Sequence, residues 1–530
     1  MKRRFRVLIT DPLHKDGLKI LRDCEHLEVV VKPGISGQEL KQEIEQCDAL
    51  IVRSQTKVSA EAIKAGKRLK VIGRAGVGVD NIDVEEATRS GVIVMNAPGG
   101  NTVSTAEHTI TLLLALSRNI TQAQLSLKNN LWERKKYIGT EVCGKVLGII
   151  GLGRIGAAVG KRAKGLGMRV IAYDPFLSLE RAKELGIESK RFEEVLKTAD
   201  YISVHTPLTP ETRHMIGERE FEMMKEGVRV INCARGGIID EQALLKAIKK
   251  GKVKGAALVV FEKEPPRDNP LLKLDCVVAT PHLGASTEEA QVGVAKEMAL
   301  QIVDALVYGN VRNAVNFPSI DKEILSLIRP YLILCEKMGS FQIQIIRGKI
   351  KQIEIKYSGE VTKYDLSPIT LSFIKGLLSF ILDKPINYVN APLIAQERGI
   401  KIVETKLSES EDFSTLISAE VITNEGKGFI AGTLFGKKEA RIVRIDDYYV
   451  DVVPQGYILL IVNEDRPGMM GAIGSILGEN KINIASMTLG RKEQGGLALT
   501  LLNIDNPVPQ QVVEQIRGLT NIVDAKVIRL

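Results

Sequence analysis

The segment KVLGIIGLGRIG, at residues 145–156, limits the possible folds of this chain more than any other stretch. It places Gly151, Gly153 and Gly156 directly after an apolar run and at the head of a helical segment. In a strand–turn–helix unit, such glycines let the backbone approach a pyrophosphate, and the helix N-terminus supplies free N–H groups and positive potential. The spacing predicts a dinucleotide-binding turn, and an ordinary strand–turn–helix is the alternative.

An acid at the end of the next predicted strand supports this prediction. The run RVIAYDP contains Asp174, 21 residues after Gly153, where a carboxylate can accept hydrogen bonds from a ribose diol. Pro175 and Phe176 follow it without an adjacent Arg, so a phosphate on the ribose would be repelled rather than paired. The sequence therefore favours NAD over NADP.

Short runs rich in Val and Ile alternate with amphipathic helical stretches up to about residue 318. This alternation predicts a doubly wound α/β architecture, and the strand-like runs are too many for one small sheet. We therefore expect two Rossmann-like parallel-sheet units. Beyond them, period-2 alternation predicts an α+β module to about residue 452. From Pro454, the order strand, helix, strand, strand, helix, strand predicts a ferredoxin-like unit.

Composition limits the class of protein. At 530 residues, the chain is too long for a single core. Its 73 basic and 64 acidic residues are interleaved rather than gathered in a stripe, so we expect no nucleic-acid partner. Apart from the N-terminal stretch, the longest apolar run begins at Ile110, and it is too short to span a membrane. The six cysteines are not spaced as metal ligands or as a disulfide-rich framework would be. We expect a cytoplasmic protein with no membrane partner and no metal site.

Three later segments end predicted strands with polar residues: INCARGG with Arg235, VVFEKEPP with Glu264, and VVATPHLGAST with His282. The carboxyl ends of parallel strands share one edge of a sheet, so these residues can converge beside the nucleotide. Hydride transfer from a hydroxy acid to NAD needs a base, which His282 suits, and a cation for the carboxylate, which Arg235 suits. Glu264 would orient the imidazole and favour its charged form, whereas Glu262 is expected to have no role in the chemistry. The alternatives are that Arg235 forms a surface salt bridge, that Glu264 is a solvated residue of a turn, and that His282 is an ordinary loop histidine.

Six motifs carry a resemblance over essentially the whole chain: GRAGVGVDNID, NAPGGNTVSTAEHT, WERKKYIGTE, GLGRIG, NCARGGIIDEQAL and TPHLGASTEEAQ. They resemble the D-2-hydroxyacid dehydrogenase family, and the C-terminal modules resemble those of its long members, which oxidise 3-phospho-D-glycerate with NAD at the start of L-serine biosynthesis. The resemblance implies four domains: a substrate-binding lobe of residues 1–98 completed by 286–318, an NAD-binding Rossmann domain of residues 99–285, an intervening allosteric-type α+β domain of residues 319–452, and an ACT regulatory domain of residues 453–530.

The same resemblance implies roles for individual residues. Arg235 would orient the substrate, and Glu264 and His282 would form the acid–base pair. A nucleophilic role for Cys233 is not expected, because no aldehyde-oxidation motif surrounds it. The residues expected to hold or line NAD are Gly151, Gly153, Arg154, Ile155, Gly156, Asp174, Thr206, Pro207, Cys233 and Ala234.

Cationic side chains would decide whether the substrate is phosphorylated. The candidates are Arg53 with Ser54, Arg74 and Arg134, since the planar fork of arginine suits phosphate and carboxylate oxygens. In similar enzymes the counterpart of Arg134 comes from a neighbouring subunit, so we expect a homo-oligomer, either a dimer or a tetramer. The alternative is that these are solvated surface cations.

The C-terminal stretch IVNEDRPGMMGAI resembles an ACT domain, a ferredoxin-like fold that binds amino acids. Pro467 and Gly468 would start a helix whose N–H groups take a carboxylate. Asn463, Asp465 and Asn483 would hold an L-serine effector, with Asn483 supplied by a partner chain. A dimerisation module without a ligand is the alternative. No cation cluster in the middle module indicates a particular ligand there.

Val259 departs from the family pattern, which usually has Asp at this place. In the family, that carboxylate accepts a hydrogen bond from the nicotinamide carboxamide, and valine cannot. Either another acceptor, such as a backbone carbonyl, takes its place, or the cofactor is oriented more loosely.

Two other functions share part of this pattern. Another D-2-hydroxyacid dehydrogenase would act on glyoxylate, hydroxypyruvate or 2-oxoglutarate, but Arg53, Arg74 and Arg134 argue against a small uncharged substrate. A regulator that binds NAD without turnover is the second, and the set formed by Arg235, Glu264 and His282 argues against it.

Overall fold

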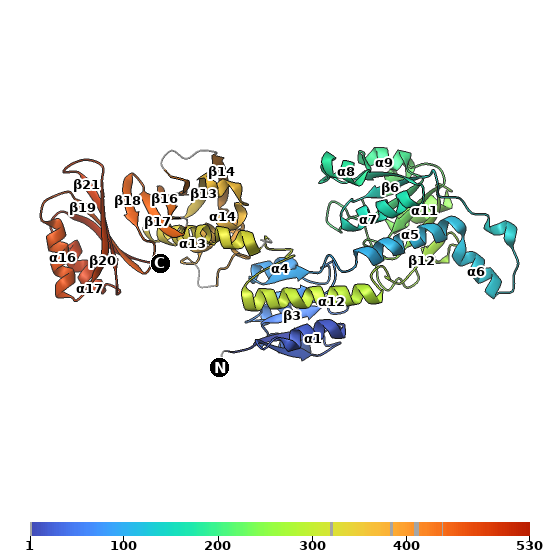
Figure 1. Cartoon of the computed structure of the whole chain (residues 1–530), viewed down its shortest axis with the longest axis horizontal. Helices are drawn as coiled ribbons and strands as arrows, with labels where there is room; N and C mark the ends of the chain where they lie inside the picture. Colours follow the sequence, from blue (N-terminus) through green and yellow to red (C-terminus); the bar gives the residue numbers. More distant parts are fainter. Residues whose placement is uncertain (1–2, 319–321, 382–384, 408–412, 437) are drawn as a thin grey trace.

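The structure is a computed structural model that describes residues 3–318, 322–381, 385–407, 413–436 and 438–530. Its strands form four sheets. The Rossmann unit lies at one end of the long axis and the C-terminal unit at the other (Figure 1). Two α/β units followed by an α+β module and a ferredoxin-like unit confirm the predicted fold class.

The first unit is a five-stranded parallel sheet in the order β2-β1-β3-β4-β5. Its strands are β1 (Phe5–Ile9), β2 (Leu27–Val31), β3 (Ala49–Val52), β4 (Val71–Arg74) and β5 (Ile93–Asn96). Its helices are α1 (Lys15–Asp23), α2 (Gly37–Ile44), α3 (Ala60–Ala65) and α4 (Val84–Arg89). Helix α12 (Glu288–Val303) comes from much later in the chain but packs on this sheet and on α1, where Gly17 lies against Ala295.

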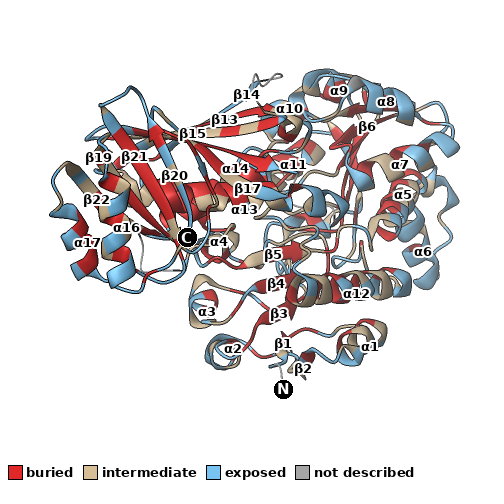
Figure 2. Ribbon diagram, turned by 60° about the vertical axis from the view of Figure 1, so that its left-hand side comes forward, coloured by how far each residue is buried: buried red, intermediate tan, exposed pale blue. Residues whose placement is uncertain are grey.

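The second unit holds a seven-stranded parallel sheet in the order β12-β11-β10-β9-β6-β7-β8. From β8 to β11 this is the strand order of a dinucleotide-binding Rossmann sheet, and β12 extends it. Helices cover both faces, so the central strands are buried on both sides and are mostly apolar (Figure 2). The strands are β6 (Val146–Ile150), β7 (Arg169–Tyr173), β8 (Glu188–Ser189), β9 (Tyr201–Val204), β10 (Val228–Asn232), β11 (Val253–Leu258) and β12 (Val277–Ala279). The helices are α5 (Thr102–Arg118), α6 (Ile120–Lys128), α7 (Arg154–Gly165), α8 (Leu179–Leu185), α9 (Phe192–Thr198), α10 (Glu218–Met223) and α11 (Glu241–Lys249).

The two C-terminal sheets are built from antiparallel pairs, apart from the parallel pair β13 and β14. The middle sheet has the order β14-β13-β15-β16-β17-β18, and the last sheet has the ferredoxin-like order β20-β21-β19-β22. The middle elements are α13 (Lys322–Ile345), β13 (Ile350–Gly359), α14 (Ser367–Leu378), α15 (Ala391–Glu397), β14 (Lys401–Leu407), β15 (Thr415–Thr423), β16 (Lys427–Phe435), β17 (Glu439–Ile445) and β18 (Tyr448–Val452). The last elements are β19 (Tyr457–Glu464), α16 (Met469–Glu479), β20 (Ile484–Arg491), β21 (Leu497–Ile504), α17 (Gln510–Arg517) and β22 (Ile522–Arg529).

The last sheet buries both of its faces. Helices α16 and α17 cover one face, while Leu460, Leu501 and Ile528 on the other belong to the same apolar core as the middle module. Gln344 on α13 and Arg529 on β22 exchange two hydrogen bonds of 2.9 and 3.0 Å. The two C-terminal units are therefore packed together through a continuous core.

The middle module also touches the first unit. Arg89 on α4 forms an ion pair of 3.0 Å with Glu397 on α15. The Asn387 amide donates a hydrogen bond of 2.8 Å to the carbonyl of Gly91, in the turn between α4 and β5. The module that continues into the C-terminal unit thus lies directly against the first sheet unit.

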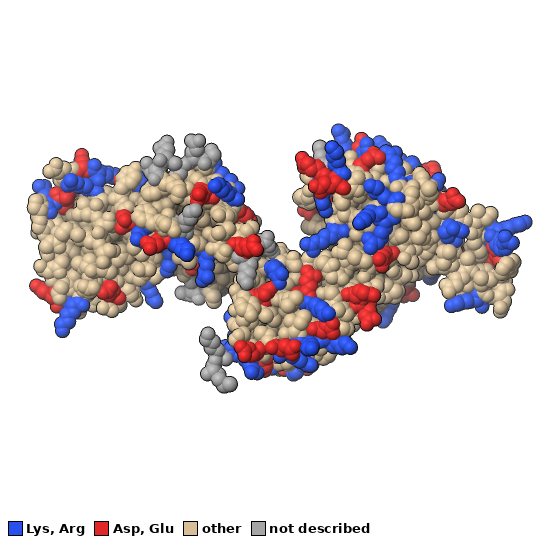
Figure 3. All heavy atoms as spheres, in the orientation of Figure 1, with Lys and Arg blue, Asp and Glu red and all other residues tan. Residues whose placement is uncertain are grey.

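The surface charge is mixed. Lys and Arg atoms are interleaved with Asp and Glu on the face drawn in Figure 3, with cations most frequent over the Rossmann unit. Among the described residues, none of the helices combines the length and the apolar composition needed to cross a membrane.

Candidate active site

The glycine-rich turn joins β6 to α7. Gly151 adopts φ +91°, which favours glycine, and a Cβ there would lie 2.8 Å from a carbonyl of the loop after β9. A Cβ on Gly156 would lie 2.1 Å from Gly151 O, so this glycine lets the helix pack on the turn. Gly153 is the N-cap, and no described atom lies within 4 Å of the place a Cβ would take. The N–H groups at Arg154 and Ile155, at the start of α7, therefore face a backbone cradle suited to an anion.

Asp174 lies at the end of β7, directly beside this turn. One carboxylate oxygen accepts a hydrogen bond of 2.8 Å from the N–H of Leu152, and the other accepts one of 2.9 Å from the N–H of Phe176. Each oxygen keeps a second lone pair for a ribose hydroxyl. The arrangement fits an adenosine ribose without a phosphate.

The loops after β9 and β10 form the wall beyond the turn. Thr206 Oγ1 and His205 Nδ1 are buried atoms without a hydrogen-bond partner in the described part of the chain. Buried polar atoms without a partner are rare in folded proteins. Burial lowers the pKa of His205 to about 4, so its ring is neutral at pH 7. Pro207 follows Thr206, and Ala234 follows β10. Together with the turn, this wall fits a bound dinucleotide.

Cys233 is part of the same wall, but its thiol is expected to be unreactive. Its side chain packs in the core of the Rossmann sheet. Burial raises the pKa of the thiol to about 12, and a hydrogen bond with Thr109 opposes this only in part. Because the thiolate is the reactive form, a buried thiol of this kind is a poor nucleophile.

Glu264 and His282 meet at the carboxyl ends of β11 and β12. His282 Nδ1 lies 2.8 Å from Glu264 Oε2, and the other oxygen of Glu264 accepts the N–H of Phe261 at 3.2 Å. Burial alone would raise the pKa of the Glu264 carboxyl, but the hydrogen bond and charge of His282, the N–H of Phe261 and the charge of Arg235 together lower it. The carboxylate is therefore ionised at neutral pH, and it fixes Nδ1 of the imidazole, so that Nε2 is available for a proton.

Arg235 follows β10 and reaches the first unit. Asn232 holds its loop through hydrogen bonds of 2.9 Å to the Arg235 carbonyl and 3.0 Å from the Ala234 N–H. The guanidinium Nε donates to Asp80 at 2.7 Å, and Gly78 leaves room for Nη2, because a Cβ there would lie 1.6 Å from it. The ion pair between Arg235 and Asp80 therefore joins the two parallel-sheet units across the site.

Arg53 and Arg74 add two more guanidinium groups from the ends of β3 and β4. Burial, together with repulsion by Arg235 and Arg53, lowers the pKa of Arg74 to about 10. Its Nε has no hydrogen-bond partner among the residues described. Ser54 is exposed next to Arg53. Since the charges of Arg235 and Arg53 act on Arg74, an anion bound beside these groups would relieve their repulsion.

The loop that carries Arg53 and Ser54 is held rigidly by two polar side chains. The buried carboxylate of Asp11 accepts the N–H of Arg53 at 2.5 Å, that of Gln55 at 3.2 Å and that of Thr56 at 3.1 Å. Asn81 donates hydrogen bonds of 2.8 and 2.6 Å to the carbonyls of Arg53 and Thr56. The loop is thus fixed from both sides.

Asp11, Asp80 and Asn81 are not among the residues that the sequence predicts for the site. The sequence does contain a signal for each of them. Asp11 follows a predicted parallel strand, where polar residues meet ligands, and Asp80 and Asn81 lie in the motif GRAGVGVDNID.

Arg134 is the predicted substrate residue that the single chain does not bring to this cluster. It lies exposed in a 3₁₀ turn, η1 (Arg134–Tyr137), which packs beside α6. Helix α6 projects from the outer side of the Rossmann unit (Figure 1). Within one chain, Arg134 is therefore not part of the cation group formed by Arg53, Arg74 and Arg235.

The predicted effector residues lie at two ends of the last sheet. Asn463 is buried and accepts a hydrogen bond of 3.0 Å from Thr500, and Asp465 forms an ion pair of 2.6 Å with Arg491, which lowers the pKa of Asp465. Asn483 donates to Asp505 at 2.7 Å, at the opposite end of β21.

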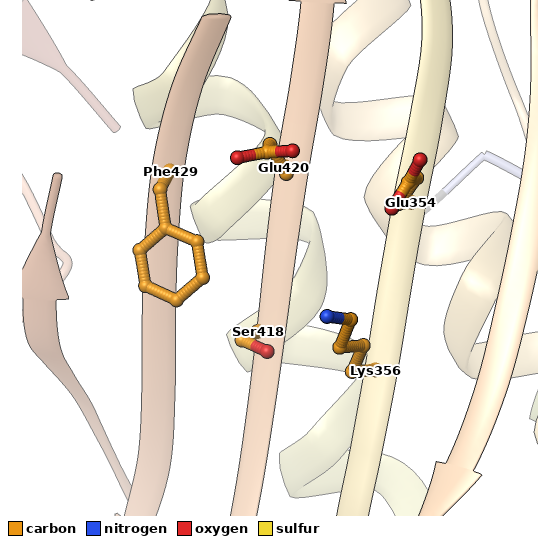
Figure 4. Close-up of a pocket in the computed structure, with 5 residues that line it drawn as sticks. All are labelled: Glu354, Lys356, Ser418, Glu420 and Phe429. Atoms are coloured by element: carbon orange, nitrogen blue, oxygen red, sulfur yellow. The ribbon is translucent and has the colours of Figure 1, made fainter.

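A shallow pocket on the open face of the middle sheet lies apart from all these residues. It is lined by Glu354 and Lys356 of β13, Ser418 and Glu420 of β15, and Phe429 of β16 (Figure 4). The two glutamates are direct cross-strand neighbours, and Lys427 offsets their repulsion through an ion pair of 2.7 Å with Glu420. Among the described residues, no group of three or more His, Cys, Asp or Glu side chains is arranged to hold a metal ion.

Comparison with known families assigns three regions of the chain. Residues 110–284 match the family described as D-isomer specific 2-hydroxyacid dehydrogenase, NAD binding domain. Residues 327–446 match the D-3-phosphoglycerate dehydrogenase intervening domain, and residues 457–521 match the ACT domain. The expected NAD-binding domain and ACT domain are confirmed by these matches.

Similar proteins cover the whole chain. It is 48% identical over 526 residues to a protein of Methanocaldococcus jannaschii named D-3-phosphoglycerate dehydrogenase, covering 99% of this chain and 100% of that one. It is also 48% identical over 529 residues to the protein of the same name from Archaeoglobus fulgidus, with the same coverage. Among solved structures, the D-lactate dehydrogenase of Aquifex aeolicus complexed with NAD and lactic acid is 30% identical, with a TM-score of 0.54, covering 59% of this chain and 100% of that chain.

Alkylation tests the state of Cys233. At pH 8 a thiol with a pKa of about 12 is ionised to only about 10⁻⁴, so iodoacetamide is expected to leave Cys233 unmodified in the folded chain while it labels the exposed Cys143. Peptide mass spectrometry measures both sites, and labelling in urea is the control in which both react. Rapid alkylation of Cys233 in the folded chain would contradict the assignment.

Proposed function

The chain belongs to the D-3-phosphoglycerate dehydrogenase family, and from this membership we propose that it oxidises 3-phospho-D-glycerate to 3-phosphohydroxypyruvate with NAD, the first step of L-serine biosynthesis. The observation that supports this most is the convergence of Arg53, Arg74 and Arg235 beside the Glu264 and His282 pair. A substrate with a carboxylate and a phosphate presents two anionic groups, and the guanidinium groups at the strand ends offer donors for both.

We assign the chemical roles from the geometry. His282 accepts the hydroxyl proton of the substrate at Nε2, because Nδ1 is engaged by Glu264. The ionised Glu264 stabilises the resulting imidazolium. Arg235 binds the substrate carboxylate through the guanidinium hydrogens that its bonds to Asp80 and Ala234 leave free. Bound NAD supplies the acceptor for the hydride. Its pyrophosphate is assigned to the turn at Gly151, Gly153 and Gly156, with the first N–H groups of α7 at Arg154 and Ile155, and its ribose to Asp174.

We further propose a homo-oligomer in which the arm formed by α6 and η1 covers a second copy of the chain. Leu125, Trp132 and Ile138 on this arm are 61%, 76% and 79% exposed, which is unusual for large apolar side chains. A partner chain would cover them, and its Arg134 would join the cation group formed by Arg53, Arg74 and Arg235.

An L-serine site between two ACT domains is proposed on geometric grounds. In one chain, Asn463 pairs with the β21 residue Ala498, whereas Asn483 adjoins the β20 residue Ile484, which pairs with Ile504. Six residues of strand span about 20 Å, so one chain cannot place Asn463 and Asn483 on the same small ligand. Asn463 and Asp465 of one chain would therefore face Asn483 of another.

We propose that the chain divides into four domains, as expected from the sequence. Residues 1–98 with 286–318, 99–285, 319–452 and 453–530 each contain one of the four sheets. The boundary after residue 318 adjoins residues 319–321, which lie outside the described residues. A cytoplasmic location is proposed because the described cysteines are all free thiols.

Replacement of the base tests the proposed function. His282→Ala is expected to lower turnover of 3-phospho-D-glycerate by roughly 10²- to 10⁴-fold, because proton transfer by a positioned side chain contributes that much. Reduced NAD is followed by its absorbance, and NAD binding is expected to stay near normal. Wild-type turnover in this variant would remove His282 from the chemistry.

Replacement of the buried Val259 tests how the cofactor is oriented. Its side chain is 1% exposed, and its carbonyl already accepts the N–H of His282 at 2.9 Å. Val259→Asp is expected to improve both NAD affinity and turnover by roughly 10-fold or more, since a hydrogen bond to a charged group contributes about 1.5–3 kcal/mol. Val259→Ala is the control that adds space without an acceptor. If neither affinity nor turnover changes in the Asp variant, the orienting contact lies elsewhere.

Asn483 tests the effector site. Asn483→Ala is expected to leave basal turnover intact and to weaken any response to L-serine by about tenfold, because a buried polar group that loses its partner costs about 1–3 kcal/mol. Titration of the full chain with L-serine measures the response. Asn480→Ala, three residues earlier, is the matched control. An unchanged response in the Asn483 variant places the effector elsewhere.

A further inference from the structure

Two carboxylates follow β11, and each of them faces a histidine. Glu264 is bonded to His282, and Glu262 Oε1 lies 3.1 Å from Nε2 of His214. Both histidines adopt left-handed backbone conformations, with φ +53° at His282 and +52° at His214, which are uncommon outside glycine. The proposed chemistry uses only the first pair, so the second pair requires its own explanation.

His214 fastens the loop after β9 to the loop after β10. Its N–H donates to the carbonyl of Gly237 at 2.7 Å. Two residues later, the N–H of Ile216 donates to Ile238 at 3.3 Å, and the carbonyl of Ile216 accepts from Asp240 at 3.0 Å. The two loops therefore run side by side as a short parallel pairing.

Glu262 fastens these loops to a third one, which follows β11. Its N–H donates to the Glu241 carboxylate at 2.6 Å, and its own carboxylate accepts the Glu241 N–H at 3.3 Å. Beside this exchange, Gly236 lies so close to the carbonyl of Phe261 that a Cβ there would approach it to 1.9 Å. The pair formed by His214 and Glu262 is thus the side-chain contact at which the three loops meet.

Each of the three loops carries a part of the proposed site. Thr206 belongs to the first loop, Arg235 to the second and Glu264 to the third. The hydrogen bond of 3.2 Å from Phe261 N–H to Glu264 ties the position of the working carboxylate to the residue next to Glu262.

We propose that Glu262 and His214 are a positioning pair, which holds Glu264 and Arg235 in register with the cofactor wall. The proposal rests on the proposed function and deepens it. Glu262 does not touch the reacting atoms and acts only through Glu264 and Arg235. The simpler explanation is an ordinary surface ion pair, since His214 and Glu262 are 38% and 34% exposed, and such a pair would not influence turnover.

A double-mutant cycle in the full chain separates the two explanations. His214→Ala and Glu262→Ala are each expected to lower kcat with 3-phospho-D-glycerate about tenfold, because a misplacement of about 1 Å at a catalytic group can cost up to roughly 10²-fold. The KM for NAD is expected to stay within about twofold. The double variant should lose clearly less than the product of the two single losses, because both changes remove the contact between His214 and Glu262.

A conservative variant and a surface control complete the design. His214→Gln keeps a donor near the place of Nε2 and should restore most of kcat. Glu218→Ala breaks an exposed ion pair with Lys246 in the same unit and should leave kcat unchanged. Hydrogen exchange followed by mass spectrometry should be faster at residues 233–241 and 259–266 in His214→Ala, with no change in the first unit.

Three results would overturn the proposal. The first is that the losses in kcat of the two single variants add up in the double variant. The second is that His214→Gln has a kcat as low as that of His214→Ala. The third is that hydrogen exchange becomes faster throughout the chain, which indicates a general role in stability. An inactive wild-type protein would instead overturn the proposed function, and the exchange pattern would still report whether the pair holds the three loops.

Discussion

Parallel strands all end at the same edge of their sheet, and the candidate site depends on this constraint. The central strands of the two parallel sheets are buried on both faces, so the polar residues that can reach a ligand lie mainly where these strands end. At these ends the chain places the glycine turn after β6, Asp174 after β7, Arg235 after β10 and Glu264 after β11. The ion pair between Arg235 and Asp80 then brings the second sheet into contact with the cation cluster of the first.

The sequence predicts the two Rossmann-like units because their central strands are continuous apolar runs that stand out between helical segments. It does not predict β2, β8 and β14, and each of these lies at the edge of its sheet. The edge strands β8 and β14 carry polar residues and give a weak apolar signal, whereas β2 reads LEVVV, so polarity does not explain its case.

The site residues are predictable as far as they follow strands in a recognisable motif. Glu264 and His282 do so, and they meet at 2.8 Å. His214 lies ten residues beyond the end of β9, and its link to Glu262 depends on how two loops fold against each other, which spacing does not encode. Arg134 and Asn483 are supplied by a partner chain in the proposed assembly. The family resemblance predicts this, but the fold of one chain does not bring them to these sites.

The central claim is that the guanidinium groups at the strand ends select a substrate with two anionic groups. Steady-state formation of reduced NAD with 3-phospho-D-glycerate and with D-glycerate tests it most directly. The predicted result is a kcat/KM at least about 10²-fold higher for the phosphorylated acid, since two charge-assisted hydrogen bonds contribute about 1.5–3 kcal/mol each. Equal kcat/KM values for the two acids would contradict it.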